Sequence, residues 1–293
     1  MNPSPLWAWM RERHAIYHRR AAGQPRPWTS DPILQRHRFC NVFRELDKVT
    51  VWIRENVREP FAEHEYLWLM LAIARTINHP ETLTELVATP GAWPFDETFD
   101  VELLAAVLQR RIDAGLPCYT GAYMIRAEND PRQACYHWTK QQYVARIVIG
   151  KLWEVREQID AQLSWTKRLQ DAQRVLTPFR GWGPFMSYEV VTDLRHTRYL
   201  RAATDTMTWA SAGPGALRGL NRLQGRPLGS KRSPGDACVA MRALLEQAAS
   251  NLPPDFPALE MRDIEHSLCE VDKYLRVLNG EGKPRSSFSG TVN

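Results

Sequence analysis

Apolar residues recur at helical spacing along most of this chain, and this periodicity points to a helical fold. Residues 36–58, RHRFCNVFRELDKVTVWIRENVR, carry apolar side chains at helical intervals, and residues 62–77, AEHEYLWLMLAIARTI, are apolar enough for a buried helix. Runs that alternate polar and apolar residues, typical of half-buried strands, are scarce, and the VVT at 190–192 lies inside a helical pattern. We therefore expect a mainly α fold.

Prolines and glycines mark the ends of further helices. Pro80 and Pro184 stand at helix starts, whereas Gly115 and Pro117 follow the end of another helix. The pattern predicts one long helix or two abutting ones over 139–176, and single helices over 80–89, 97–114, 184–200, 236–250 and 258–279. Because we find neither an internal repeat nor an obvious linker, we expect a basic N-terminal segment at 1–35, a single helical domain at 36–280 and a flexible tail at 281–293.

The composition is that of a globular protein and excludes several classes. Of the 293 residues 44% are hydrophobic, and no run approaches the roughly 20 apolar residues that a membrane span needs. The apolar patch at residues 5–10 is too short for a signal-peptide core. The five cysteines form no CxxC pair, so neither a disulfide framework nor a zinc ribbon follows. We expect a cytoplasmic protein that makes no contact with a membrane.

Charge is distributed unevenly along the chain. Residues 55–130 hold five basic and thirteen acidic groups, whereas residues 176–235 hold nine basic and only three acidic groups. Most of these nine are arginines, which bind phosphate through two parallel hydrogen bonds, and aromatic residues are interleaved with them. This window favours a polyanion such as DNA as partner, and the alternative is a solvated basic face.

Several familiar motifs are absent. The segment GRPLGSKRS, which starts at Gly225, lacks the GxxxxGK[ST] spacing of a nucleotide-binding loop, and no strand precedes it. The sequence has no HExxH and no GxSxG motif. Of the eight histidines only His14 and His18 stand four residues apart. They lie in a basic segment, where histidines are more often surface residues than metal ligands. We therefore expect no metal site and no cofactor.

Residues 166–205 have the form of a helix-hairpin-helix. One helix ends near Leu176, a tight FRGWG turn follows, and Pro184 starts the next helix. Glycines allow a close approach of backbone, and free N–H groups at a helix start bind phosphate, so the turn is predicted to contact DNA. The predicted DNA-binding residues are Arg180, Gly181, Trp182, Gly183, Tyr188, Arg195 and Arg198. The plain alternative is a turn between two packed helices.

Two aspartates follow this element. Helix-hairpin-helix DNA glycosylases carry a functional aspartate about twenty residues after the second glycine, and Asp205 lies 22 residues after Gly183. Asp193 lies only ten after it, inside the next helix. Either is a candidate for a base-binding cleft, and the alternatives are an N-cap for Asp205 and an arginine partner for Asp193.

A second glycine turn precedes a basic helix at SAGPGALRGLNRL. Backbone donors at Gly213 and Gly215, together with Arg218 and Arg222 one turn apart, are predicted to bind a phosphate. A turn followed by a basic helix face explains the same pattern without a ligand.

Three segments together resemble the alpha-glutamyl/putrescinyl thymine pyrophosphorylase family of bacteriophages. They are RFCNVFRELDKVTVWI at 38–53, GWGPFMSYEVVTDL with SAGPGALRGL at 181–220, and LCEVDKYLRVLNGEGKPR at 268–285. The resemblance spans roughly residues 36–285 and implies a helical, DNA-glycosylase-like fold similar to the helical domain of 5-hydroxymethyluracil DNA kinases. It also implies an activity: an amino acid such as glycine, or putrescine, replaces a phosphate or pyrophosphate on the 5-methylene group of a thymine analogue in DNA.

The resemblance also carries residues onto this chain. The early Asn-x-x-Arg-x-x-Asp pattern falls on Asn41, Arg44 and Asp47, and the late motif includes Glu270 and Lys273. These residues are expected to share a pocket with the amine or the leaving phosphate, and a polar network that fixes a helix is the alternative. The implied partners are DNA containing 5-phosphomethyluracil and a small amine donor, in a phage-infected host cell, after a 5-hydroxymethyluracil DNA kinase has acted.

The chemistry leaves the assignment of roles open. The attacking amine must be neutral, so a carboxylate base is needed, and Asp47, Asp193 and Asp205 are candidates. The base must leave the stack, and Trp182 or Tyr188 is expected to stack on it. Two other functions fit the same sequence: a hydrolytic DNA glycosylase, and a DNA-binding module without chemistry that serves a kinase.

Overall fold

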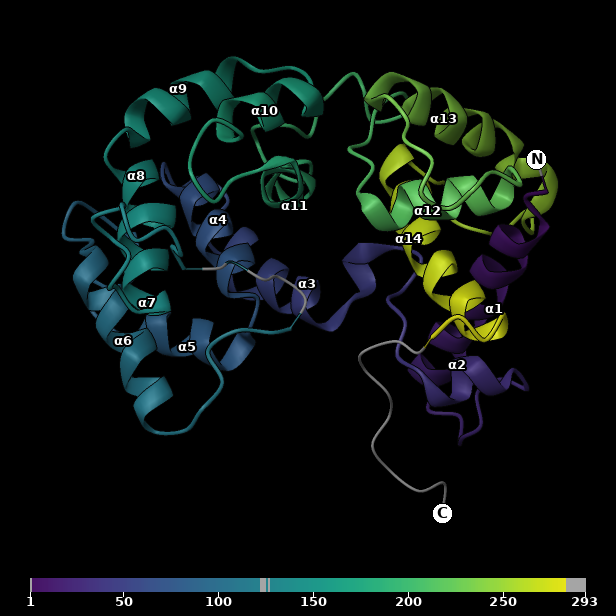
Figure 1. The fold of residues 1–293 in the computed structure, drawn as a ribbon, viewed down its shortest axis with the longest axis horizontal. Helices are drawn as coiled ribbons and strands as arrows, with labels where there is room; N and C mark the ends of the chain where they lie inside the picture. Colours follow the sequence, from purple (N-terminus) through teal and green to yellow (C-terminus); the bar gives the residue numbers. More distant parts are fainter. Residues whose placement is uncertain (1, 122–124, 126, 283–293) are drawn as a thin grey trace. The chain divides into compact units, whose positions relative to one another are not determined.

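The computed structural model describes residues 2–121, 125 and 127–282 (Figure 1). These residues form helices joined by turns, and no strand occurs among them. The expectation of a mainly α fold is therefore confirmed.

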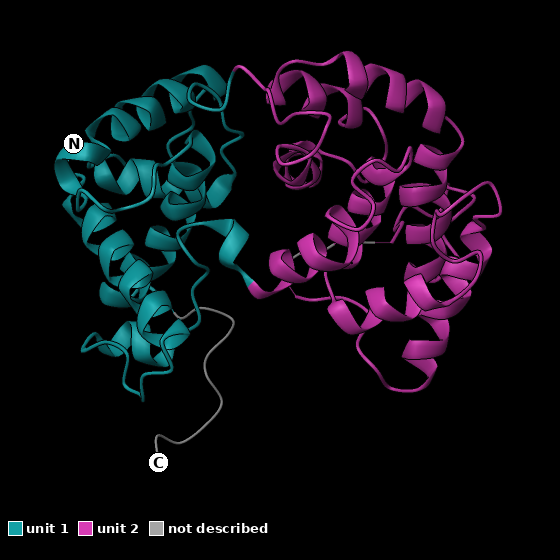
Figure 2. Cartoon of the chain, turned by 180° about the vertical axis from the view of Figure 1, so that it is seen from behind, with its two compact units in different colours: residues 1–47, 205–293 teal, residues 48–204 magenta. Residues whose placement is uncertain are grey.

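The chain divides into two compact units (Figure 2). Unit 1 combines residues Met1–Asp47 with Asp205–Asn293, and unit 2 is the continuous segment Lys48–Thr204. These boundaries differ from the one expected at residue 35, and the tail expected at 281–293 lies, from residue 283 on, outside the described residues. No change in composition marks the unit boundaries in the sequence, because each unit has its own apolar core and the chain simply passes from one to the other at residues 47 and 205.

Unit 1 is built around a long C-terminal helix. Its helices are α1 (Ser4–Ala21), α2 (Pro32–Arg36), the 3₁₀ turn η1 (Arg44–Leu46), α12 (Pro214–Leu223), α13 (Pro234–Asn251) and α14 (Met261–Leu278). Helices α1, α12 and α13 all pack against α14. Leu6, Trp7 and Met10 of α1 are buried, so the basic N-terminal residues belong to this unit rather than to a separate segment.

Two glycines let α12 lie very close to α14. A Cβ atom at Gly219 would clash with the backbone carbonyl of Leu268, and one at Gly215 would clash with the sulfur of Cys269. Gly215 and Gly219 are four residues apart and therefore face α14 together. This contact fixes α12 against the part of α14 that carries the late motif.

Unit 2 has a fully buried helix at its centre. Its elements are α3 (Lys48–Ile53), α4 (Leu67–Ile77), α5 (Pro80–Ala88), α6 (Val101–Asp113), α7 (Lys140–Tyr143), α8 (Gly150–Trp153), α9 (Arg156–Trp165), α10 (Leu169–Leu176), α11 (Pro184–Leu194) and the π-helical stretches η2 (Arg54–Arg58) and η3 (Val144–Ile149). Every residue of α4 is buried, and α11 packs along it.

Two predicted helices differ from the structure. Residues 37–47 form a loop with a single 3₁₀ turn, because the side chains of Asn41 and Asp47 hydrogen-bond within the loop and compete with helical bonding. Residues 139–176 form several short helices interrupted by η3 and by turns, rather than one or two long helices. The other predicted helices appear, with ends shifted by up to six residues.

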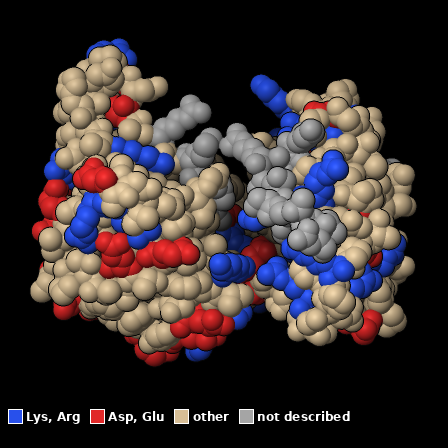
Figure 3. Space-filling view, turned by 90° about the horizontal axis from the view of Figure 1, so that it is seen from below, with Lys and Arg blue, Asp and Glu red and all other residues tan. Residues whose placement is uncertain are grey.

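The positive charge of the protein belongs to unit 1. Unit 1 holds 19 basic and 14 acidic side chains and unit 2 holds 19 of each, so the formal net charge of +5 comes entirely from unit 1. In the view of Figure 3, basic side chains predominate on unit 1, and acidic and basic side chains are mixed on unit 2. An electrostatic attraction to DNA would therefore act mainly on unit 1.

Candidate active site

Residues of the early and late motifs lie together in unit 1. Glu270, in the middle of α14, accepts a hydrogen bond from the backbone N–H of Cys40 at 2.9 Å. The same carboxylate oxygen lies 2.8 Å from the ammonium group of Lys273, one turn later on the helix. Glu270 therefore joins the loop that carries the early motif to the helix that carries the late motif.

Asn41 and Asp47 face each other across the loop. The backbone N–H and the side-chain amide of Asn41 donate to Oδ1 of Asp47 at 2.8 and 3.0 Å. The same amide also donates to the carbonyl of Leu46 at 2.8 Å. The two residues thus meet as expected, although a folded-back loop and not a helix face brings them together.

Two residues that the sequence did not single out complete this group. Nε2 of His266, on α14, lies 3.8 Å from Oδ2 of Asp47. The sulfur of Cys40, Nε2 or Nδ1 of His266 and a carboxylate oxygen of Asp47 all lie within 4.8 Å of one another. We call the group of Cys40, Asn41, Asp47, His266, Glu270 and Lys273 the α14 cluster.

Burial is the main influence on the pKa values of Asp47 and Cys40. It raises the pKa of Asp47, although His266, the N–H of Asn41 and Arg44 act in the opposite direction. Burial also raises the pKa of the Cys40 thiol well above its usual value, and the nearby carboxylates of Glu270 and Asp47 add to the shift. In the absence of a cation, Cys40 is therefore a protonated thiol at neutral pH.

Basic side chains surround these acids. Burial lowers the pKa of Lys273, but Glu270, Cys40 and Cys269 together outweigh that effect, so the net shift is upward and the ammonium group stays charged. Arg13, on α1, donates to the carbonyl of Phe39 at 3.2 Å and so holds the loop from the other side. Arg44 is buried next to Asp47. The two carboxylates of the α14 cluster, Asp47 and Glu270, thus lie near three cations: Lys273 within the cluster, and Arg13 and Arg44 beside it.

In the second glycine turn, acidic side chains of the protein already bind the backbone and arginine groups that were predicted to bind phosphate. The N–H of Gly213, at the start of α12, donates to Glu265 at 3.3 Å. Arg222 pairs with Asp272 at 2.7 Å and also with Glu281, and Arg218 lies 3.3 Å from Asp272. Together with the packing of Gly215 on Cys269, these contacts give the turn a structural role, and phosphate binding there stays a prediction.

The predicted hairpin connects α10 and α11. Gly181 has a positive φ of 90°, and a Cβ atom there would meet the side chain of Val148 at 2.8 Å. Gly183 is the N-cap of α11, is exposed, and has no atom close to the position of a Cβ. Arg180 is exposed and pairs with Glu128. Two helices and a glycine turn are thus present, and binding of DNA to them stays a prediction.

Both aromatic residues expected to stack on a base lie in the core. Trp182 is fully buried and its indole N–H donates to the carbonyl of Val148 at 2.8 Å, and Tyr188 is buried as well. Neither ring can reach a base in this structure, because both are enclosed by other side chains. The guanidinium of Arg198 donates to the carbonyls of Ala62 and His64, so it fastens a turn of unit 2. Arg195, likewise predicted to contact DNA, donates to the carbonyl of Arg201 at 3.1 Å.

The two aspartates after the hairpin are inaccessible. Asp193, on α11, forms two charged hydrogen bonds with Arg75 of α4, at 2.5 and 2.6 Å, and Arg58 lies 3.9 Å away. This matches the alternative expectation of an arginine partner. Asp205 is also buried, and its backbone carbonyl accepts from Thr208 and Trp209. Of the three predicted base candidates, Asp47 is the one whose carboxylate accepts hydrogen bonds from a residue of the early motif, Asn41.

A family model matches nearly the whole chain. It is the model of the 5-hmdU DNA kinase, helical domain, and it covers residues 4–283. The chain belongs to this family. Membership of the 5-hmdU DNA kinase helical-domain family accounts for both units, because the match runs through unit 1, unit 2 and back into unit 1.

A curated relative of this helical-domain protein is longer than the chain itself. The 5-hmdU DNA kinase of Bacillus phage SP10 is 26% identical over 285 residues, which cover 90% of this chain and 43% of the relative. The chain thus spans less than half of that kinase. No solved structure matches. Among the described residues, no helix has the length and apolar character required to span a bilayer.

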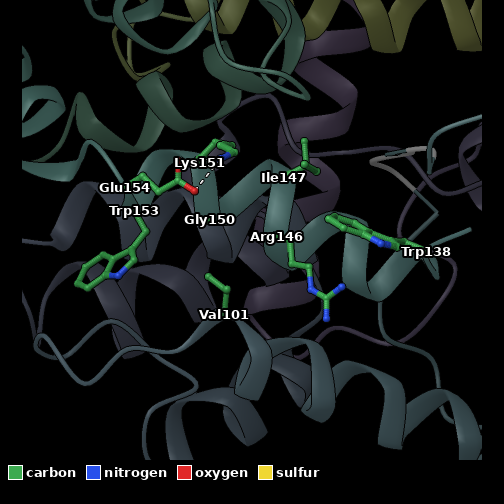
Figure 4. Close-up of a pocket in the computed structure, with 8 residues that line it drawn as sticks. All are labelled: Val101, Trp138, Arg146, Ile147, Gly150, Lys151, Trp153 and Glu154. Atoms are coloured by element: carbon green, nitrogen blue, oxygen red, sulfur yellow. Dashed lines mark hydrogen bonds and ion pairs between the residues drawn. The ribbon is translucent and has the colours of Figure 1, made fainter. Parts of the chain in front are cut away.

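Unit 2 of this helical-domain protein has a separate surface pocket (Figure 4). Its volume is about 360 Å³. Trp138 and Trp153 lie on opposite sides of it, and Lys151 forms an ion pair with Glu154 at 2.7 Å. Arg146 stacks over Trp138 and pairs with Glu102. None of the residues predicted for the site lines this pocket.

Proposed function

We propose that the protein modifies thymine analogues in DNA by transferring an amine to the 5-methylene carbon of 5-phosphomethyl or pyrophosphomethyl deoxyuridine. The α14 cluster carries this proposal, since it brings Asn41 and Asp47 of the early motif to Glu270 and Lys273 of the late motif. Membership of the 5-hmdU DNA kinase helical-domain family supports a modified thymine as the substrate.

The proposed reaction is a substitution at one carbon. The nitrogen of the amine forms a bond to the 5-methylene carbon, and the bond from that carbon to the phosphate oxygen breaks. One proton leaves the nitrogen for a carboxylate, and phosphate or pyrophosphate departs with the electron pair of the broken bond. The substrate must come from a phosphorylation of the 5-hydroxymethyl group, which is the class of reaction that the name of the SP10 relative describes.

The α14 cluster has the groups that this reaction needs. A departing phosphate requires positive charge, which Lys273, Arg13 and Arg44 provide around the loop. Proton removal from the amine requires a carboxylate, and the α14 cluster offers Asp47 and Glu270. We propose that the amine donor, with glycine as the first choice, binds between these carboxylates and cations.

The turn between α10 and α11, in unit 2, is proposed to contact DNA, and the positive charge of unit 1 is a separate source of attraction to DNA. Exposed Arg180 and the free edge of Gly183 at the start of α11 are suited to contact phosphate. Arg180→Ala is expected to weaken DNA binding and to reduce its salt dependence by about one counterion. Arg132→Ala, which removes another exposed guanidinium paired with an aspartate, is the matched control.

A second function is a DNA-binding module that serves a kinase without catalysing a reaction. The family description and the greater length of the SP10 relative favour it, because both place such a helical region beside a kinase. It predicts the same affinity for DNA and no chemical change of the DNA. A glycosylase, the third function, predicts release of a free base.

The deciding experiment is mass analysis of nucleosides. DNA that contains 5-phosphomethyluracil, or its pyrophosphate ester, is incubated with the protein and with glycine, glutamate or putrescine, and is then digested. A nucleoside that carries one specific amine, with release of phosphate or pyrophosphate, is the expected result. Unchanged nucleosides with measurable binding of both DNAs would establish the module, and free base would establish the glycosylase.

A matched pair of variants locates the reaction. Glu270→Gln removes one carboxylate of the α14 cluster at nearly constant shape and is expected to lower the transfer rate by at least about 100-fold. Glu246→Gln, at an exposed position on α13, is expected to leave the rate unchanged. Equal transfer rates for the two variants would show that the α14 cluster is not the site of the reaction.

A further inference from the structure

The three side chains of Cys40, Asp47 and His266 have no common role in the proposed transfer, yet they converge. They come from the loop before η1, from the residue after η1 and from α14, and all three ligand atoms lie within 4.8 Å of one another. Among the described residues, no other group of three or more such side chains meets this condition. Sulfur, imidazole nitrogen and carboxylate oxygen are the three donor types that bind zinc in proteins.

We propose that Cys40, Asp47 and His266 bind one zinc ion. Zinc lies about 2.0–2.3 Å from its ligands in a tetrahedron, so two ligand atoms of one zinc are about 3.3–3.6 Å apart. The 3.8 Å between Nε2 of His266 and Oδ2 of Asp47 is close to that separation and too long for a hydrogen bond. Thiolate and imidazole are softer ligands than magnesium or calcium accepts, which selects zinc among the common cations.

The surroundings hold these ligands as the outer shell of a metal site does. Asn41 donates twice to Oδ1 of Asp47, so the other oxygen, Oδ2, is directed at His266. Glu270 accepts the N–H of Cys40 and so fixes the position of that residue. Hydrogen bonds of this kind orient ligands, and their loss weakens metal binding by about 10- to 100-fold.

The charges of the site accommodate the ion. A thiolate and a carboxylate together neutralise the two charges of zinc, and imidazole binds as a neutral ligand. Of the nearby cations, Lys273 is paired with Glu270, Arg13 is bound to the carbonyl of Phe39, and Arg44 contributes a buried positive charge. Three protein ligands leave a fourth position for an exogenous oxygen or nitrogen, as in catalytic zinc sites. With Asp47 as a ligand, Glu270 is the carboxylate that receives the proton in the proposed transfer.

The test measures zinc on the protein alone, and so its outcome is independent of the transfer reaction. Protein stripped with a chelator is mixed with one equivalent of zinc, separated from free ion and analysed by mass spectrometry for metal. We expect about one zinc per chain, with binding at least tenfold weaker in Cys40→Ser and in His266→Ala. A wild-type protein that retains less than a tenth of an equivalent overturns the proposal.

Control variants distinguish this site from other thiols and imidazoles. Cys238→Ser removes a cysteine outside the α14 cluster. His18→Ala disrupts the competing pair on α1, in which Nε2 of His18 lies 3.0 Å from Nε2 of His14. Both are expected to keep full zinc binding. Zinc lost with His18 but not with His266 would assign the ion to α1 and overturn the proposal.

Two further measurements remain decisive if a variant fails to fold. Cobalt in place of zinc should give the intense near-ultraviolet absorption of a thiolate–cobalt bond in the wild-type protein. Zinc should also protect Cys40, but not Cys238, from alkylation, as read by peptide mass analysis. A cobalt protein without that absorption, or equal alkylation of Cys40 with and without zinc, would refute the assignment.

Discussion

The carboxylate of Glu270 accepts the backbone N–H of Cys40 at 2.9 Å, across 230 residues of sequence. This one contact unites the two ends of the chain in unit 1, because Cys40 lies in its N-terminal part and Glu270 in its C-terminal part. Lys273 completes the contact by neutralising the buried carboxylate. The fold of unit 1 and the composition of the α14 cluster therefore depend on the same residues.

The pair of Glu270 and Lys273 is expected to be coupled energetically. Lys273→Met removes the ammonium group and leaves the buried Glu270 carboxylate without its cation. We expect a loss of about 1–2 kcal/mol, less than for a fully buried pair because Lys273 is partly exposed. In the double variant with Glu270→Gln this loss should largely disappear, as measured by urea denaturation in a double-mutant cycle. Strictly additive losses would show that the two groups do not interact.

Asp193 is expected to stabilise unit 2 rather than to act on a substrate. Asp193→Asn leaves the guanidinium of Arg75 buried without its counter-charge, which costs about 3–5 kcal/mol. Asp171→Asn breaks an exposed pair with Arg174 and is expected to change the free energy of unfolding by less than about 1 kcal/mol. Calorimetric unfolding of both variants provides the measurement. A stable Asp193→Asn protein that has lost only its activity would restore Asp193 as a candidate base.

Adding a single methyl group to α12 tests its close contact with α14. Gly219→Ala places a Cβ atom against the carbonyl of Leu268, so we expect a destabilisation of about 2 kcal/mol or more. Gly235→Ala, also within a helix, meets only the Ser233 oxygen at 3.8 Å and should be neutral or stabilising by up to about 1 kcal/mol. Denaturant midpoints compare the two. A harmless Gly219→Ala would mean that the helices are further apart than this structure places them.

Some parts of this fold can be predicted from the sequence and others cannot. Helix α5 follows from apolar spacing and from Pro80 at its start, and α6, α13 and α14 follow from apolar spacing, which are local signals. Residues 37–47 have the same apolar spacing and yet form a loop, because side-chain hydrogen bonds of Asn41 and Asp47 replace helical ones. The division into two units is not local at all, since it depends on which distant helices share a core.

The candidate site shows the same limit. A family resemblance selected Glu270 and Lys273 as well as Asn41 and Asp47, and the first two are also one helical turn apart. Cys40 and His266 carry no such signal, because 226 residues separate them and neither belongs to a metal-binding motif. The scattered histidines and cysteines led us to expect no metal site, whereas the fold assembles three donors from separate segments.

Asp263 should make the stability of the protein depend on pH. It lies in the first turn of α14, where burial raises its pKa to about 6, against the opposing effects of Arg262 and of the N–H of Glu260. Between pH 4 and pH 6 the folded protein thus keeps a proton that the unfolded chain has already released. Its stability should fall over this range as pH rises, by up to about 3 kcal/mol, and should then level off.

Asp263→Asn isolates this contribution, because asparagine keeps the shape and a hydrogen-bond acceptor but does not titrate in this range. The difference in free energy of unfolding, variant minus wild type, should increase from pH 4.5 to pH 6.5 and stay constant from pH 7 to pH 8. Urea denaturation at each pH gives this difference, and other titrating groups largely cancel in it. A difference that stays flat, or that decreases with pH, would show that Asp263 is ionised in the folded protein throughout this range.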